Sequence, residues 1–182
     1  MRIRHLAQLL VLVLALGACL VACGGRTATS VHRAGNVRSN ARWVILPIEN
    51  HSETPQAGER VEAMLDTLLR RGGVGNLEKY PPQKDDDTHL LTSDRQRFEA
   101  ALTWARGAKF DYAVAGSVEE WRYKSGLDGE PAIGVSMRIL DLATGKVVWV
   151  ATGSKTGAGN DNTSLTALKL LDEMVKGIAT PQ

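Results

Sequence analysis

The stretch YAVAGSVEEWRYK, residues 112–124, decides the fold of this chain. Tyr112, Val114 and Val118 recur with a period of two, which is typical of a strand that buries one face. After the two glutamates the period is broken, because Trp121 and Tyr123 fall on the opposite parity. This switch predicts a β-bulge, or a strand that extends beyond its own core.

The segments that follow extend this strand into a sheet. Residues 133–139 alternate with the same period, and the turn at residues 141–145 predicts a hairpin with residues 147–154. A last helix is predicted from Thr163 or Ser164, with Leu165, Leu168 and either Leu170 or Leu171 among its inward residues.

The segments before residue 112 predict two further strands and two helices. The apolar run 43–48 is typical of a buried strand, and Thr54-Pro55 opens a helix that Gly72-Gly73 ends. A short strand is predicted at residues 74–80, and Ser93 with Gln96 forms a capping box at the start of the next helix. The order is therefore β-α-β-α-β-β-β-α. It predicts an α+β fold, with one mixed, mainly antiparallel sheet packed by about three helices.

The N-terminus carries the features of a lipoprotein signal. Residues 10–22 are mostly apolar, follow Arg2 and Arg4, and are too few to cross a bilayer. Both cysteines of the chain lie at the end of this run. Leu20-Val21-Ala22-Cys23 resembles a bacterial lipobox, whereas cleavage before Cys19 would leave a free Cys23. The alternative is an ordinary secreted protein with incidental cysteines.

We therefore predict three parts: a signal peptide at residues 1–22, a lipidated flexible tether at residues 23–41, and a single domain at residues 42–182. The tether is expected to be flexible because it is polar and poor in large apolar residues. Several acyl chains on Cys23 would hold the protein firmly on a membrane. No aspartate follows Cys23, which in such lipoproteins favours the outer membrane.

The charges divide unevenly along the mature chain. Removal of Arg2 and Arg4 leaves 20 Lys+Arg against 20 Asp+Glu. Four of these basic residues are arginines in residues 26–42, so 16 basic residues face the 20 acids beyond residue 42. The sequence thus predicts a basic tether and an acidic domain, a distribution that argues against nucleic-acid binding.

The sequence shows no constellation typical of catalysis. No cysteine remains in the mature domain to act as a nucleophile, and the four histidines lack the spacing of a zinc site. Glu119 and Glu120 are adjacent on a strand, so their side chains are expected on opposite faces, where they cannot flank one bond. We predict that the protein is not an enzyme and uses neither a metal nor another cofactor.

Two surface features leave alternatives open. Glu119, Glu120, Asp128 and Glu130 crowd one region, where they favour a cationic ligand or simply keep a loop soluble. Trp149 either marks a partner or membrane surface or lies in the core, because a register shift of one residue exchanges the two faces of its strand.

Residues 43–60 and above all residues 118–131, VEEWRYKSGLDGEP, resemble the PelC family of outer-membrane lipoproteins in Pel exopolysaccharide export. A looser pattern is shared with CsgG-like and LpoB-like periplasmic lipoproteins. The resemblance implies a non-enzymatic homo-oligomeric ring, thought to be a dodecamer, on the periplasmic side of the exporter PelB. It also implies an acidic surface that guides a cationic polysaccharide, with Glu119, Glu120, Asp128 and Glu130 toward the polymer and Trp149 toward outer-membrane lipid. The alternative function is a lipoprotein activator that binds a periplasmic cell-wall synthase.

Overall fold

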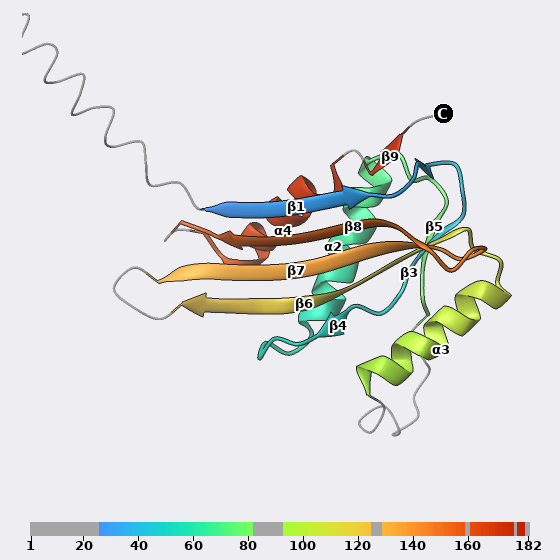
Figure 1. Ribbon diagram of the computed structural model, residues 1–182. Coiled ribbons are helices and arrows are strands. Elements are labelled where there is room, and N and C mark those ends of the chain that lie inside the picture. The colour runs from blue at the N-terminus through green and yellow to red at the C-terminus, as the bar shows by residue number, and fades with distance from the viewer. Residues whose placement is uncertain (1–25, 82–92, 125–128, 159–160, 177, 181–182) are drawn as a thin grey trace, which may run out of the picture.

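The computed structural model describes residues 26–81, 93–124, 129–158, 161–176 and 178–180 (Figure 1). Within these residues a seven-stranded sheet has the order β1-β8-β7-β6-β3-β5, and β4 pairs with β6. The strands are β1 (Thr27–Arg33), β3 (Trp43–Ile45), β4 (Glu49–Asn50), β5 (Leu77–Lys79), β6 (Tyr112–Lys124), β7 (Glu130–Asp141) and β8 (Val147–Thr156). The strands β2 (Val37–Arg38) and β9 (Ala179–Thr180) form a separate parallel pair.

The sheet is mixed, as predicted. Neighbours from β1 through β8 and β7 to β6 are antiparallel, whereas β3 runs parallel to both β6 and β5, and β4 runs parallel to β6. Three helices pack on the sheet in the described part of the chain: α2 (Ala57–Arg71), α3 (Asp94–Gly107) and α4 (Thr163–Val175). The predicted α+β class is confirmed, and the strands β1, β2, β4 and β9 were not expected.

Helices α3 and α4 begin at side-chain caps, whereas α2 begins at Ala57, not at the predicted Thr54-Pro55, after Gln56, which makes no side-chain cap hydrogen bond. Ser93 caps α3 through a capping box with Gln96, as the sequence indicated. Asn162 caps α4 by accepting a hydrogen bond from the backbone N–H of Leu165, one residue before the predicted cap.

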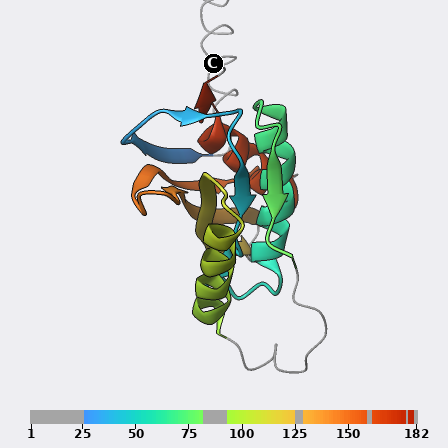
Figure 2. The same ribbon diagram turned by 90° about the vertical axis from the view of Figure 1, so that its right-hand side faces the viewer.

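The two faces of the sheet are covered unequally. Helices α2 and α4 pack side by side on one face and enclose the larger core (Figures 1 and 2). On the other face, α3 covers the end of the sheet formed by β3, the beginning of β6 and the end of β7, where Val44, Ala113 and Ala115 share a smaller core with Ala101 and Ala105. The remainder of that face, formed by β1, β8, the first part of β7 and the second half of β6, carries no helix from the described residues. We refer to it as the open face.

The predicted bulge lies in β6. Val118 pairs with Val135 and Glu120 pairs with Gly134, so Glu119 is an additional residue in the ladder. Val118 and Trp121 are consequently buried in the same core despite their opposite parity.

The flexible tether predicted up to residue 41 is corrected by the structure. Thr27–Arg33 pairs residue by residue with β8 as an edge strand, and Val37–Arg38 pairs with β9. All seven residues of β1 are exposed, so this strand depends on backbone pairing and not on apolar burial. Composition therefore does not reveal it.

This correction also changes the charge of the domain. The arginines at positions 26, 33, 38 and 42 belong to the folded unit, which then carries 20 basic against 20 acidic residues. The domain is not acidic as a whole. Any attraction for a cation must come from the local arrangement of carboxylates.

Trp149 lies in the core, so the expectation that it faces a membrane is wrong. Its exposed fraction is 1%, and it packs in the cluster beneath α2 and α4. Its neighbour Val150 takes the open face instead and is 38% exposed. The register of β8 thus selects the core alternative that the sequence left open.

Candidate ligand-binding pocket on the open face

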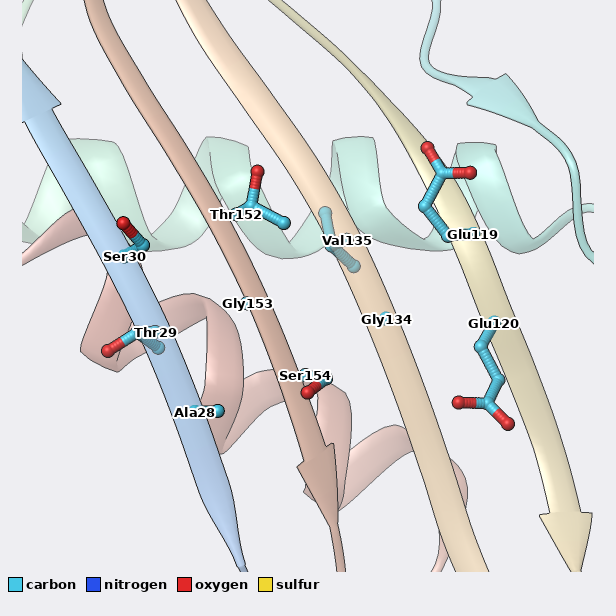
Figure 3. A pocket seen from close by; sticks show the side chains of 10 residues that line it. All are labelled: Ala28, Thr29, Ser30, Glu119, Glu120, Gly134, Val135, Thr152, Gly153 and Ser154. Carbon is cyan, nitrogen blue, oxygen red and sulfur yellow. The ribbon is translucent and has the colours of Figure 1, made fainter.

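A pocket of about 460 Å³ opens on the open face, across β1, β8, β7 and β6 (Figure 3). Its lining consists mainly of small and hydroxyl-bearing residues, with two glutamates on the β6 side: Ala28, Thr29, Ser30, Glu119, Glu120, Gly134, Val135, Thr152, Gly153 and Ser154.

The pocket is hollow because one row of residues across the sheet has short side chains. Ala28 pairs with Ser154, which pairs with Gly134, and Gly134 pairs with Glu120. Paired residues on neighbouring strands point to the same face, so this row forms the floor. A methyl group added at Gly134 would meet the Cβ of Glu120 at 3.4 Å, which is close to ordinary contact.

The bulge brings both glutamates to one site. The expectation that Glu119 and Glu120 point to opposite faces is wrong, because the additional residue in β6 interrupts the alternation. Both side chains line the pocket, as Figure 3 shows. Sequence pattern indicated the bulge, but not that its consequence would be two carboxylates beside one cavity.

Glu119 is held by two neighbours. The hydroxyl of Ser117 donates a hydrogen bond to its carboxylate, and the Nδ1 atom of His51 lies 3.2 Å from its Oε2. Both contacts lower the pKa of Glu119 below its ordinary value, and the hydrogen bond from Ser117 has the larger effect. The Nε2 atom of His51 also lies 3.3 Å from Oε2 of Glu49. The pKa of His51 is raised, mainly by its hydrogen bond with Glu119 and to a smaller extent by the contact with Glu49.

Glu120 has a cation of its own. The Nε atom of Arg122 donates to its Oε1 at 2.6 Å, and the Arg122 side chain is 64% exposed. An exposed pair of this kind contributes little stability and exchanges readily with another cation. Both carboxylates are therefore accessible to a positively charged ligand, with 47% of the Glu119 side chain and 34% of the Glu120 side chain exposed.

The hydroxyl groups define what else the pocket can bind. Ser30 and Thr152 pair across β1 and β8, and Ser154 lies on the floor. Each hydroxyl can donate or accept a hydrogen bond, so the site suits a ligand that combines positive charge with hydroxyl groups. The sequence analysis missed these residues. The alternation of Thr152 and Ser154 with buried small residues in β8 is the signal that could have identified them.

Of the other predicted ligand residues, only Glu130 lies among the described residues, and it does not line the pocket. Glu130 begins β7 opposite Lys124, away from the lining residues, and its role as a ligand residue stays a prediction. Cys23 and Asp128 lie outside the described residues. Among those that are described, no group of three or more His, Cys, Asp or Glu side chains is placed to hold a metal ion. No helix in the same part of the chain has the length and apolar character to cross a membrane.

Comparison with known proteins identifies the family. No protein-family model matches the sequence, and no curated protein matches it. The PelC dodecamer from Paraburkholderia phytofirmans has 31% sequence identity and a TM-score of 0.72, and a variant of that dodecamer has 29% identity and a TM-score of 0.73. Both comparisons cover 86% of this chain and 100% of the PelC chain.

The fold itself is more widely distributed. Lipoprotein GNA1162 from Neisseria meningitidis shares it at 19% identity and a TM-score of 0.53, over 71% of this chain and 92% of that one. These comparisons indicate no catalytic family. With a PelC structure aligned over its whole length at 31% identity, the chain belongs to the PelC family.

Proposed function

We propose that this protein is a lipid-anchored, ring-forming export adaptor that guides a cationic exopolysaccharide of the Pel type to its outer-membrane exporter, PelB. The observation that carries this proposal is the bulge in β6, which sets Glu119 and Glu120 beside a hydroxyl-lined pocket on the open face. A protonated amino sugar offers the complementary groups, an ammonium and several hydroxyls.

The pocket acts as one member of an array. Because the folded unit carries equal numbers of acidic and basic residues, a single copy exerts no strong long-range attraction. The related PelC structures are dodecamers. A ring of this chain would present many pairs of carboxylates to one polymer, and weak contacts linked in this way add up to firm binding.

The anchor is the acylated Cys23, exposed after removal of residues 1–22. Multiple acyl chains retain the protein on the periplasmic face of the outer membrane. A ring on this surface is well placed to receive a polymer that arrives from the periplasm. In this role the protein performs no bond-making step and needs no cofactor.

The test is binding of a partly deacetylated amino-sugar oligosaccharide to the assembled protein, measured by calorimetry. The double variant Glu119→Gln with Glu120→Gln is compared with the wild type. The matched control is Glu59→Gln with Glu99→Gln, which removes two exposed carboxylates from α2 and α3. We expect binding to weaken in the pocket variant alone.

Ionic strength provides a second readout. Raising the salt from about 0.15 to 1 M shortens the screening length from about 8 to 3 Å, so binding should weaken steeply. Equal losses in both double variants would contradict a specific role of the pocket. Native mass spectrometry of the same samples counts subunits, and a strict monomer in the presence of lipid would contradict the ring. Recovery of a cell-wall synthase instead of the exporter in a pull-down from envelopes would favour the alternative function.

A further inference from the structure

The start of β1 limits how far the folded unit can lie from Cys23. Only residues 24–26 separate Cys23 from Thr27, where pairing with β8 begins. A fully extended chain spans at most about 3.6 Å per residue, so the Cα atoms of Cys23 and Thr27 lie within about 14 Å. The tether expected from composition, up to residue 41, would have reached about 65 Å.

The strand register shows which end of the sheet this short connection holds. Thr27 pairs with Lys155, Lys155 with Ile133, and Ile133 with Trp121, so these four residues form one row across the sheet. Beyond this row, β6 continues to Lys124, and β7 begins at its partner residue 130. At about 3.3 Å per residue, these two strands extend about 10 Å past the row.

The hairpin and the anchor leave the row in the same direction. β1 runs from Thr27 toward Arg33, which pairs with Trp149 near the opposite end of the sheet. Arg26, whose carbonyl accepts a hydrogen bond from the backbone N–H of Thr156, therefore continues β1 on the side to which β6 and β7 extend. Because the connection spans at most about 14 Å and the hairpin extends about 10 Å past the row, the end of the hairpin can reach the depth of the anchor.

The side chains at this end suit the headgroup region of a bilayer. Arg122 has 64% of its side chain exposed, Tyr123 is 49% exposed, and Lys124 and Arg26 are exposed as well. Basic residues contact lipid phosphates, and tyrosine favours the membrane–water interface. Arg122 retains the ion pair with the neighbouring glutamate described above, and Glu130 lies opposite Lys124.

We propose that the end of the β6–β7 hairpin, with Arg122, Tyr123 and Lys124, rests on phospholipid headgroups. This inference rests on the proposed acylation of Cys23. Its consequence concerns the pocket, because the floor residues Ala28 and Gly134 lie one position from the row that contains Thr27. A polymer held in the pocket would then lie just above the membrane that it must cross.

The test uses the acylated chain, purified from bacterial membranes and reconstituted in vesicles of phosphatidylethanolamine and phosphatidylglycerol. A fluorophore is attached at Lys124→Cys, and the matched control carries it at Thr144→Cys in the turn between β7 and β8, at the opposite end of the sheet. The introduced cysteine is the only free thiol, since Cys19 is removed with the signal and Cys23 is acylated. A headgroup-attached quencher reports proximity to lipid.

We expect the label at position 124 to lose most of its fluorescence and the label at 144 to lose little. A flexible spacer of Gly and Ser inserted between Gly25 and Arg26 should restore the signal at 124. Equal quenching at both positions, or no effect of the spacer, would overturn the proposed orientation while leaving the export role intact. The mass of the N-terminal peptide and vesicle flotation are measured on the same preparation. A chain without acyl groups that does not float would overturn the anchoring, and with it this inference.

Discussion

Replacement of Trp149 by alanine tests whether this residue supports the core or the membrane contact. The indole is 1% exposed beneath α2 and α4, and truncation of a buried tryptophan costs about 3–5 kcal/mol. Its Nε1 atom has no hydrogen-bond partner among the described residues. Removing an unpaired buried N–H recovers about 1 kcal/mol, the lower end of its burial penalty. The net loss expected for Trp149→Ala is therefore about 2–4 kcal/mol.

The assays are urea unfolding, which gives the free energy of unfolding, and thermal unfolding, which gives Tm, of the chain that begins at Arg26, both followed by circular dichroism. For a domain of this size, about 1 kcal/mol corresponds to about 2–4 °C in Tm, so Tm should fall by about 4–16 °C. The matched control is Val150→Ala on the same strand, whose side chain points to the open face. An exposed substitution of this kind changes the free energy of unfolding by about 0.5 kcal/mol or less.

The two possible roles of Trp149 predict opposite outcomes. A core residue loses stability when truncated, and its loss affects membrane binding only through unfolding. If Trp149→Ala left the free energy of unfolding within about 1 kcal/mol of the wild type and instead weakened binding to vesicles, the burial of Trp149 described here would be refuted.

Three further substitutions test the packing, the pocket and its electrostatics. Gly58→Ala would place Cβ 2.2 Å from a backbone oxygen and should cost about 1–3 kcal/mol in a thermal melt, whereas Gly107→Ala, with open space around it, should cost nothing. Gly134→Val should leave the fold intact and weaken oligosaccharide binding in calorimetry by filling the pocket floor; unchanged affinity would argue against binding there. The ion pair of His51 and Glu119 should contribute fully between pH 4.5 and 6.5, the ordinary pKa values of the two groups, because the pKa of Glu119 is lowered and that of His51 is raised. The stability difference between wild type and His51→Gln should therefore shrink as the pH rises above 6.5 through the raised pKa of His51. The change should be at most about 1 kcal/mol, because the pair is exposed. A stability difference that grew with pH would contradict this assignment.

Residue periodicity predicted the part of the fold that depends on apolar burial. The alternation in residues 112–124 identified β6 and its bulge, since a strand with one buried face must resume the same face after an insertion. The capping box at Ser93 located the start of α3 for an equally local reason. In α4 the predicted stripe was displaced, because Leu165 and Leu168 are each 40% exposed while Met174 is buried. A helix rich in leucine offers more than one apolar face.

Features that depend on tertiary contacts could not be predicted from the sequence. β1 buries almost no side chain and is specified by the free edge of β8, which a local pattern cannot report. The pocket arises only when Ala28, Ser154 and Gly134, residues from three distant segments, come to lie in one row. The presence of Glu119 and Glu120 at one site likewise follows from the geometry of the bulge, and not from their adjacency in the sequence.

The neutral charge of the folded unit restricts how a cationic polymer can be attracted. Net charge contributes no long-range attraction here, because the 20 basic and 20 acidic residues from Arg26 onward cancel. Attraction then depends on carboxylates that are close to the polymer and repeated in space. This is why subunit assembly and pocket geometry matter together, and why a monomer should bind the polymer weakly.

Export of the polysaccharide by living bacteria tests the central claim most directly. The quantity to measure is secreted polymer from cells that carry Glu119→Gln with Glu120→Gln in the chromosomal copy, at matched protein level and ring size. The pocket role predicts reduced secretion in these cells and normal secretion in cells with Glu59→Gln and Glu99→Gln. Wild-type secretion from cells without the two pocket carboxylates would contradict it.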